Sequence, residues 1–265
     1  MVVTSGCVAC LSACVLFTNV DGLTGGAPGS GRDAGTPADE AGVDALGMHA
    51  DGSTDAPIGT GTEAAAPSPI RIMTFDDGRL VDPVTGADTE QGGVELESAK
   101  PIHGAFSAHL PGKDLTYLQV ALPTLTELYV SFYMRSDGNP GNEIRLVNVE
   151  GSGTSQASLT FSRDGTLRLG NKDSAIGGAS ATLTGGEVYR VGLHIKASST
   201  SGAAVMEAFL AGNNVAYGAP FASSSNESTS PTIDRFSIGT TGSNSFRFSA
   251  TVDDIAFDRA VLPSL

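Results

Sequence analysis

From Pro69 onward, glycine, asparagine and aspartate residues divide the sequence into short runs in which apolar and polar side chains alternate. In the run LYVSFYMR (128–135), every second residue from Leu128 to Met134 is a large apolar one. This period of two is typical of β-strands, because successive side chains of a strand point to opposite faces, whereas a helix needs apolar residues three or four positions apart. The region sustains no helical period. The pattern therefore predicts an all-β fold whose strands each bury one face.

Twelve of these runs are expected to form the strands of two stacked antiparallel sheets, a β-sandwich of the jelly-roll type. A composition with 34 glycines, 13 prolines and no tryptophan agrees with many short strands joined by turns. The sequences RDG (163–165) and AGNN (211–214) are predicted hairpin turns. The predicted strands are residues 70–75, 92–98, 104–110, 116–122, 128–135, 144–150, 157–162, 166–171, 188–197, 203–211, 235–241 and 245–257.

The first 20 residues form an apolar segment in which LSAC (11–14) resembles the lipobox of bacterial lipoproteins. The resemblance implies an exported protein that carries a lipid on Cys14, at the outer membrane or cell surface. No lysine or arginine precedes the apolar run, and the run is short, so an ordinary secretory signal or an apolar start without a role remain alternatives. Because a membrane-spanning helix needs roughly 18 or more apolar residues, we expect membrane attachment only through a lipid anchor at Cys14.

Residues 21–68 contain eight acidic residues and one basic residue, Arg32, among glycine, alanine, proline and threonine. Such a segment buries too little apolar surface to offset the entropy of ordering it, so it is predicted to be a disordered acidic linker before a domain at 69–265. The whole chain has a formal net charge of −14. An acidic surface repels nucleic acid and anionic lipid headgroups, which argues against both as partners.

The order of motifs in the domain resembles the concanavalin A-like lectin and glucanase superfamily, which includes laminin G-like domains. The resemblance covers residues 70–260 and departs from the family where Tyr189 stands in place of a common tryptophan. It implies a jelly roll in which the first and last strands lie side by side. The motifs are FDDG (75–78), LYVSFYMR (128–135), LTFSRDGTLRLGN (159–171), GEVYRVGLHIKA (186–197), MEAFLAGNNVAYG (206–218) and ATVDDIAFDRA (250–260).

Two aspartate pairs are the candidate metal ligands. Strict alternation in the last strand puts one of Asp253 and Asp254 on the face of Ile255 and the other on the face of Val252, so at least one carboxylate is expected to point inward. Adjacent first and last strands would bring Asp76 and Asp77 close to this pair. Carboxylate oxygens suit Ca²⁺, and the resemblance also implies a structural calcium. The alternative is that backbone amides of nearby turns satisfy these carboxylates.

The sequence gives little support for catalysis. The Glu-x-Asp-x-Glu triplet of the related glucanases is absent, and Glu95 and Glu97 are expected on the solvated face of an edge strand. His103 and His109 are predicted to share a strand face as a surface pair. The chain contains no Gly-x-Ser-x-Gly motif either. Lyases of the same fold use Arg, Gln, His and Tyr, residue types that the strands contain without a spacing that brings them together.

The leading hypothesis is therefore a non-catalytic binding module that engages a polysaccharide or an extracellular protein. Tyr129, Tyr133 and Arg135 share the polar face of one strand and are the candidate ligand-binding residues. The alternative is a diverged polysaccharide lyase or glycoside hydrolase on the same fold. A third hypothesis is an adhesion protein that presents loops such as residues 222–231.

Overall fold

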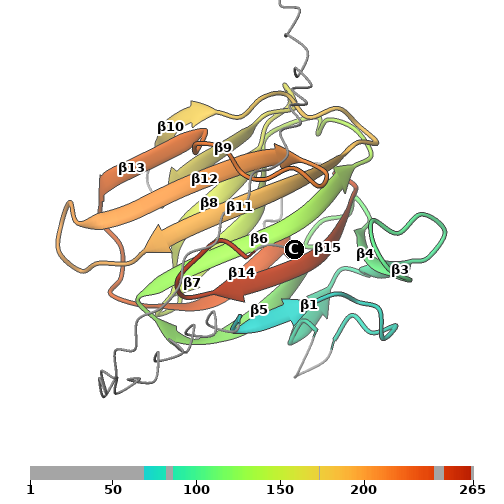
Figure 1. Cartoon of the computed structure of the whole chain (residues 1–265), viewed down its shortest axis with the longest axis horizontal. Coiled ribbons are helices and arrows are strands. Elements are labelled where there is room, and N and C mark those ends of the chain that lie inside the picture. The colour runs from blue at the N-terminus through green and yellow to red at the C-terminus, as the bar shows by residue number, and fades with distance from the viewer. Residues whose placement is uncertain (1–68, 82–85, 173, 242–247, 264–265) are drawn as a thin grey trace, which may run out of the picture. The chain divides into compact units, whose positions relative to one another are not determined.

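The computed structural model describes residues 69–81, 86–172, 174–241 and 248–263. These residues form two antiparallel β-sheets packed face to face, which confirms the predicted sandwich (Figure 1). The described residues include no helix that is long and apolar enough to cross a membrane. The predicted signal segment with Cys14 and the predicted linker at 21–68 lie outside the described residues.

The eight-stranded sheet faces the viewer in Figure 1 and has the order β13-β12-β11-β6-β15-β4-β3, with β1 also paired to β15. Its pairs of neighbouring strands are all antiparallel. The strands are β1 (Arg71–Met73), β3 (Glu95–Glu97), β4 (Ser107–Leu110), β6 (Glu127–Ser136), β11 (Val188–Lys196), β12 (Ala204–Gly212), β13 (Ala222–Glu227) and β15 (Ala250–Asp258). The β1–β15 pair confirms that the first and last strands are neighbours.

The seven-stranded sheet lies behind it and has the order β10-β9-β8-β7-β14-β5-β2. The RDG turn joins β8 to β9, as predicted, and the hairpin that it forms pairs Phe161 with Leu167. The strands are β2 (Thr89–Gln91), β5 (Tyr117–Leu125), β7 (Ile144–Gly151), β8 (Thr154–Phe161), β9 (Leu167–Asn171), β10 (Ala175–Ala179) and β14 (Ile233–Gly239).

The core lies between the two sheets and is built from the alternating apolar residues. In β6, the four predicted core residues from Leu128 to Met134 have no exposed surface. Phe257 of β15 meets Phe236 of β14 edge to face, with ring centres 5.2 Å apart, so aromatic contacts join the two sheets. Burying a side chain of this size contributes roughly 1.5 to 3 kcal/mol to folding, which is why the alternation determines the sandwich.

Three short strands, β2, β10 and β13, were not predicted. Each lies at an edge of its sheet, and β13 consists of ASSSNE, which the sequence suggested as part of a presented loop. That interpretation of residues 222–227 is wrong, because these small polar residues pair with β12. Their sequence shows no alternation, since an edge strand of this kind buries little side-chain surface.

Candidate functional site

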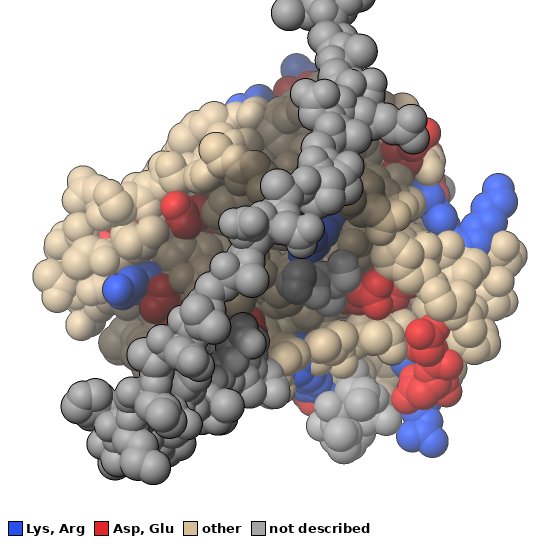
Figure 2. Space-filling view, viewed as in Figure 1, with Lys and Arg blue, Asp and Glu red and all other residues tan. Residues whose placement is uncertain are grey.

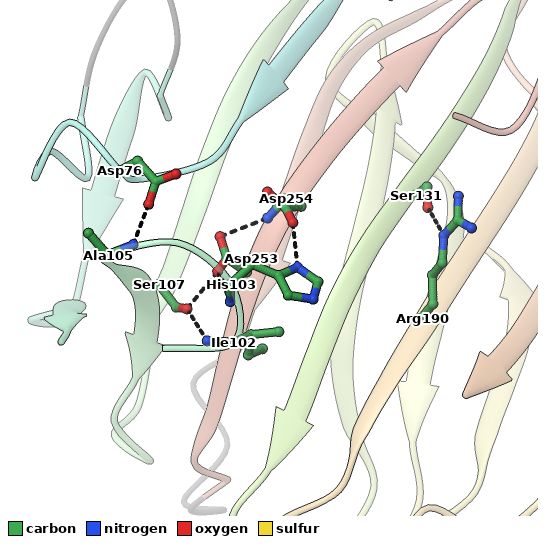
Figure 3. Close-up of polar contacts among 9 residues, drawn as sticks. All are labelled: Asp76, Ile102, His103, Ala105, Ser107, Ser131, Arg190, Asp253 and Asp254. Carbon is green, nitrogen blue, oxygen red and sulfur yellow. Dashed lines mark hydrogen bonds and ion pairs between the residues drawn. The ribbon is translucent and has the colours of Figure 1, made fainter. Parts of the chain in front are cut away.

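The two aspartates of β15 sit in a β-bulge. Figure 3 shows their polar contacts in close-up. The pairing of β15 with β6 shifts register between Asp253 and Ala256, and Asp254 has a left-handed backbone with φ of 46°. Because of this bulge, Val252 and Ile255 both belong to the core. Strict alternation predicted that one aspartate side chain points into the core, and this is wrong. The extra residue of the bulge allows both aspartate side chains to point away from the core.

Asp253 is nevertheless fully buried, beneath the turn that precedes β4. Its Oδ2 accepts hydrogen bonds from the Ser107 hydroxyl (2.7 Å) and the His103 amide (3.1 Å), and its Oδ1 accepts one from the Asp254 amide (2.9 Å). Burial raises the pKa of Asp253 to about 6, and the charge of Asp254 acts in the same direction. The hydrogen bonds oppose this rise, because they favour the ionised form.

The other three aspartates also have partners within the chain. Asp254 Oδ2 lies 2.6 Å from His103 Nδ1, Asp76 accepts the amide of Ala105 (2.7 Å), and Asp77 accepts the amide of Arg79 (3.1 Å). His103 thus belongs to a turn and not to the strand of His109, which corrects their predicted shared face.

The four aspartates do not form a calcium-binding set of oxygen ligands in this structure. Ca²⁺ takes six to eight oxygen ligands at one point. No group of three or more His, Cys, Asp or Glu side chains that could hold a metal ion occurs among the described residues. Asp76, Asp77 and Asp253 instead accept hydrogen bonds from backbone amides, as in the alternative prediction, whereas Asp254 is paired with the His103 ring. A bound calcium stays a prediction.

The predicted tyrosine platform on β6 is only partly accessible. Tyr133 is 1% exposed, with its ring 4.4 Å from that of His103, so it cannot stack on a sugar. Tyr129 is half-buried and stacks on His194 with ring centres 4.1 Å apart. Arg135 donates to the carbonyl of Lys100 (2.6 Å). The structure therefore places the three residues on one face, as expected, but not as an open binding surface.

Other segments of the chain cover the middle of this face. Tyr217, from the connection after β12, lies over Gly192, and its hydroxyl lies 2.8 Å from that of Ser131. Arg190 lies under the same ring, 4.5 Å from its centre, and donates to Ser131 and to the carbonyl of Pro263. Figure 3 shows the Arg190–Ser131 contact. Burial raises the pKa of Tyr217 to about 12, which fits its role as a cover.

A charged cluster lies on the same face, toward one end of β6. His194 Nδ1 is 2.7 Å from Glu207, and its Nε2 is 2.9 Å from Glu127. Burial acts to raise the pKa of Glu127, but hydrogen bonds from His194 and Tyr129 outweigh it and hold the pKa below its ordinary value. On the parts of this side that Figure 2 shows uncovered, charged side chains are scattered among uncharged ones.

The outer face of the seven-stranded sheet carries a hollow of about 280 Å³. We call it the polar hollow. It is formed by β7, β8, β9, β10 and the residues next to them. Its polar lining includes Glu143, Arg145, Ser158, Thr160, Arg168 and Asn171.

The polar hollow is organised by strand register. Arg145 of β7 pairs with Thr160 of β8, and Thr160 pairs with Arg168 of β9, so these three residues form one row across the sheet. Neighbouring strands are about 4.8 Å apart, which puts the backbones of the two arginines about 10 Å from each other. In the next row, Gly170 pairs with Ser158 and has no side chain to fill the space.

The sequence alone did not predict this site, although part of the signal is present. The predicted strands contain arginines, but the sequence does not show which residues of β7, β8 and β9 pair with each other. The available signal was the polar character of the outward positions, Arg145, Thr160 and Arg168, in three consecutive predicted strands. Register between strands decides whether such residues meet, and hydrophobic alternation alone does not fix it to the residue.

Comparison with known proteins gives structural neighbours. No protein-family model matches the chain, and no curated protein matches it. Cip1, a cellulose-induced protein, has a TM-score of 0.51 and 18% identity over 73% of this chain and 99% of that chain. The ligand-binding domain of botulinum neurotoxin serotype D, in complex with N-acetylneuraminic acid, has a TM-score of 0.51 and 14% identity over 74% of this chain and 48% of that chain.

A third neighbour is the binding domain of botulinum neurotoxin DC in complex with SialylT, with a TM-score of 0.51 and 11% identity over 73% of this chain and 49% of that chain. This chain therefore spans about half the length of the neurotoxin chains that it matches. At these identities the likeness shows a shared fold, the two-sheet jelly roll.

Proposed function

We propose that the protein is a non-catalytic polysaccharide-binding module and that the polar hollow is its binding site. The observation that carries the proposal is the row of Arg145, Thr160 and Arg168, which lines an open hollow large enough for sugar rings. Sugars present many hydroxyl groups, and a polar lining offers donors and acceptors for them. The complex of a neurotoxin domain of this fold with N-acetylneuraminic acid supports a sugar ligand.

The residues around the hollow favour binding over catalysis. Hydrolysis of a glycosidic bond uses two carboxyl groups, and the lining contains one, Glu143. The lining also contains no histidine or tyrosine that could act as the base of a lyase. The diverged lyase or hydrolase is therefore the second candidate, and assays for new double bonds or reducing ends on the same polysaccharides would reveal it.

Filling the hollow tests the proposal. Thr160→Phe places a large side chain between the two arginines, on a strand position that accepts aromatic residues. We expect loss of glycan-array signal and of retardation in gels that contain polysaccharide. Thr89→Phe, on the exposed edge strand β2, is the matched control and should bind like the wild type. Equal glycan binding by both variants would show that the binding site lies elsewhere. If the wild type binds no glycan but captures an extracellular protein, the proposal is contradicted.

We further propose export to the cell surface, with a lipid on Cys14, and kinship with the concanavalin A-like superfamily. The LSAC sequence supports the first, and the pairing of first and last strands supports the second. Labelling of expressing cells with a radioactive fatty acid should mark the wild type and not Cys14→Ser. Labelling of both proteins, or of neither, would contradict the anchor.

A further inference from the structure

The charge of the polar hollow differs from that of the whole protein. Two of the side chains that line it are arginines and one is a carboxylate, Glu143, whereas the chain as a whole has a formal net charge of −14. An acidic protein repels acidic polymers at long range, so it needs local positive charge to bind them. The hollow offers such a place.

Arg145 is exposed and has no ion-pair partner among the residues that the structure describes. On the same sheet, Arg235 differs, since its guanidinium lies 3.2 Å from the carboxylate of Glu150. Arg145 therefore keeps its donors available at the rim of the hollow.

Arg168 has one ion-pair partner, Asp164, and it can exchange this partner for an anionic ligand at little cost in free energy. Its Nη2 lies 3.3 Å from Asp164, and both side chains are about half exposed, at 46% and 52%. Exposed pairs of this kind contribute little to stability, because water and salt screen the two charges. Asp164 also accepts hydrogen bonds from the hydroxyl and amide of Thr166, which lower its pKa and satisfy it without Arg168.

We infer that the ligand of the polar hollow is an acidic polysaccharide, whose carboxylate or sulfate groups are bound by Arg145 and Arg168. This inference rests on the proposed function and names its ligand class. The guanidinium group offers five donors in a planar fork that matches an oxyanion with two hydrogen bonds. Two arginines in one row, with Thr160 between them, can hold anionic groups on successive parts of one chain, while the hydroxyls of Ser158 and Thr160 face the sugar ring.

The experiment compares retardation of the full chain in gels that contain a polyuronate, a sulfated galactan or a neutral glucan. The variant Arg145→Ala/Arg168→Ala removes both guanidinium groups. The control Arg163→Ala/Arg235→Ala removes the same charge at two exposed arginines that do not line the hollow. All four positions are exposed, so the variants should keep the circular dichroism spectrum and thermal midpoint of the wild type.

We expect the wild type to bind at least one of the two acidic polymers more tightly than the glucan. We expect the hollow variant to lose about tenfold or more in affinity, since a hydrogen bond to a charged group contributes about one power of ten or more. The control variant should lose much less. Comparison of the polyuronate with the sulfated polymer identifies which anion is bound.

Two results would overturn the inference and leave the proposed function standing. The first is that the wild type binds the neutral glucan tightly and the hollow variant keeps this binding. The second is that the hollow and control variants lose the same affinity for the acidic polymers, because the net charge alone would then explain the binding. A wild type that none of the three polymers retards, with no signal on a glycan array, would overturn the proposed function itself.

Discussion

The carboxylate of Asp253 and the hydroxyl of Ser107 form a hydrogen bond of 2.7 Å between β15 and β4, and neither side chain has any exposed surface. The same hydroxyl accepts a hydrogen bond from the amide of Ile102 (2.7 Å), so it links the buried carboxylate to the turn above it. His103 and Asp254 supply the other two donors to the carboxylate. This network fixes the turn before β4 onto the bulge of β15.

Removing the hydroxyl should destabilise the protein. Ser107→Ala leaves the amide of Ile102 without its acceptor and removes one of three donors from Asp253. A buried group that loses its partner costs about 1 to 3 kcal/mol, so we expect a loss of about 2 to 4 kcal/mol in the free energy of unfolding, measured in urea. Ser223→Ala, at an exposed position of β13, should change it by less than about 0.5 kcal/mol. Similar values for both variants would show that the network contributes little.

Asp253 should also make stability depend on pH. Its pKa is about 6 in the folded protein and about 3.9 in an unfolded chain, so the folded state binds the proton more tightly. This contribution is fully present below about pH 4 and is lost as the pH rises through about 6. A shift of two units corresponds to about 3 kcal/mol in full, of which about 2 kcal/mol is gained between pH 7 and pH 4, so unfolding should become harder as the pH falls.

The variant Asp253→Asn isolates this effect, because its side chain does not titrate. The difference in unfolding free energy between wild type and variant should change by about 2 kcal/mol over the same pH range. The lowered pKa values of Glu97, Glu127 and Asp164 act in the opposite direction at lower pH, and they cancel in this difference. Parallel curves for the two proteins would contradict the assignment.

The bulge shows where prediction from the sequence ends. The apolar residues of 250–257 correctly predicted a buried strand, but Val252 and Phe257, which strict alternation puts on opposite faces, both belong to the core. Alternation could not reveal the extra residue at Asp253 and Asp254, since a bulge depends on the partner strand and on hydrogen bonds from the turn at residues 102–107. The sequence therefore identified the two aspartates as unusual and assigned the wrong face to one of them.

The faces of the two sheets illustrate the same limit. Alternation predicted correctly that Tyr129 and Tyr133 point away from the core. It could not predict that Tyr133 is buried, because the residues that cover this face come from distant parts of the chain, such as His103 and Tyr217. The polar hollow depends on the register between β7, β8 and β9. This register is fixed by the packing of the folded sheets, so it cannot be read from the alternation within each strand.

Calcium gives a third prediction. A structural ion present at 100 times its dissociation constant would stabilise the fold by about 2.7 kcal/mol. Since Asp76, Asp77, Asp253 and Asp254 are each bound to donors of the chain, we expect the same thermal midpoint in excess calcium and in a chelator. A midpoint that falls with the chelator and recovers with calcium would establish the ion that the sequence predicted. Magnesium at equal concentration is the control for ionic strength.

The contact between Gly192 and Tyr217 should make a side chain at position 192 displace the Tyr217 ring. A Cβ atom at this position would lie 2.9 Å from the Tyr217 ring, closer than such atoms approach in proteins. Gly192→Ala must therefore displace the ring from Arg190 and Ser131, and overpacking of this kind costs about 1 to 3 kcal/mol in the free energy of unfolding. Gly218→Ala, next to Tyr217 with open space around it, is the matched control and should cost less.

With Tyr217 displaced in Gly192→Ala, the pKa of Tyr217 should fall from about 12 toward its ordinary value, which a titration of the tyrosine NMR signal would detect. An unchanged signal and stability in Gly192→Ala would show that Tyr217 does not cover this face in solution.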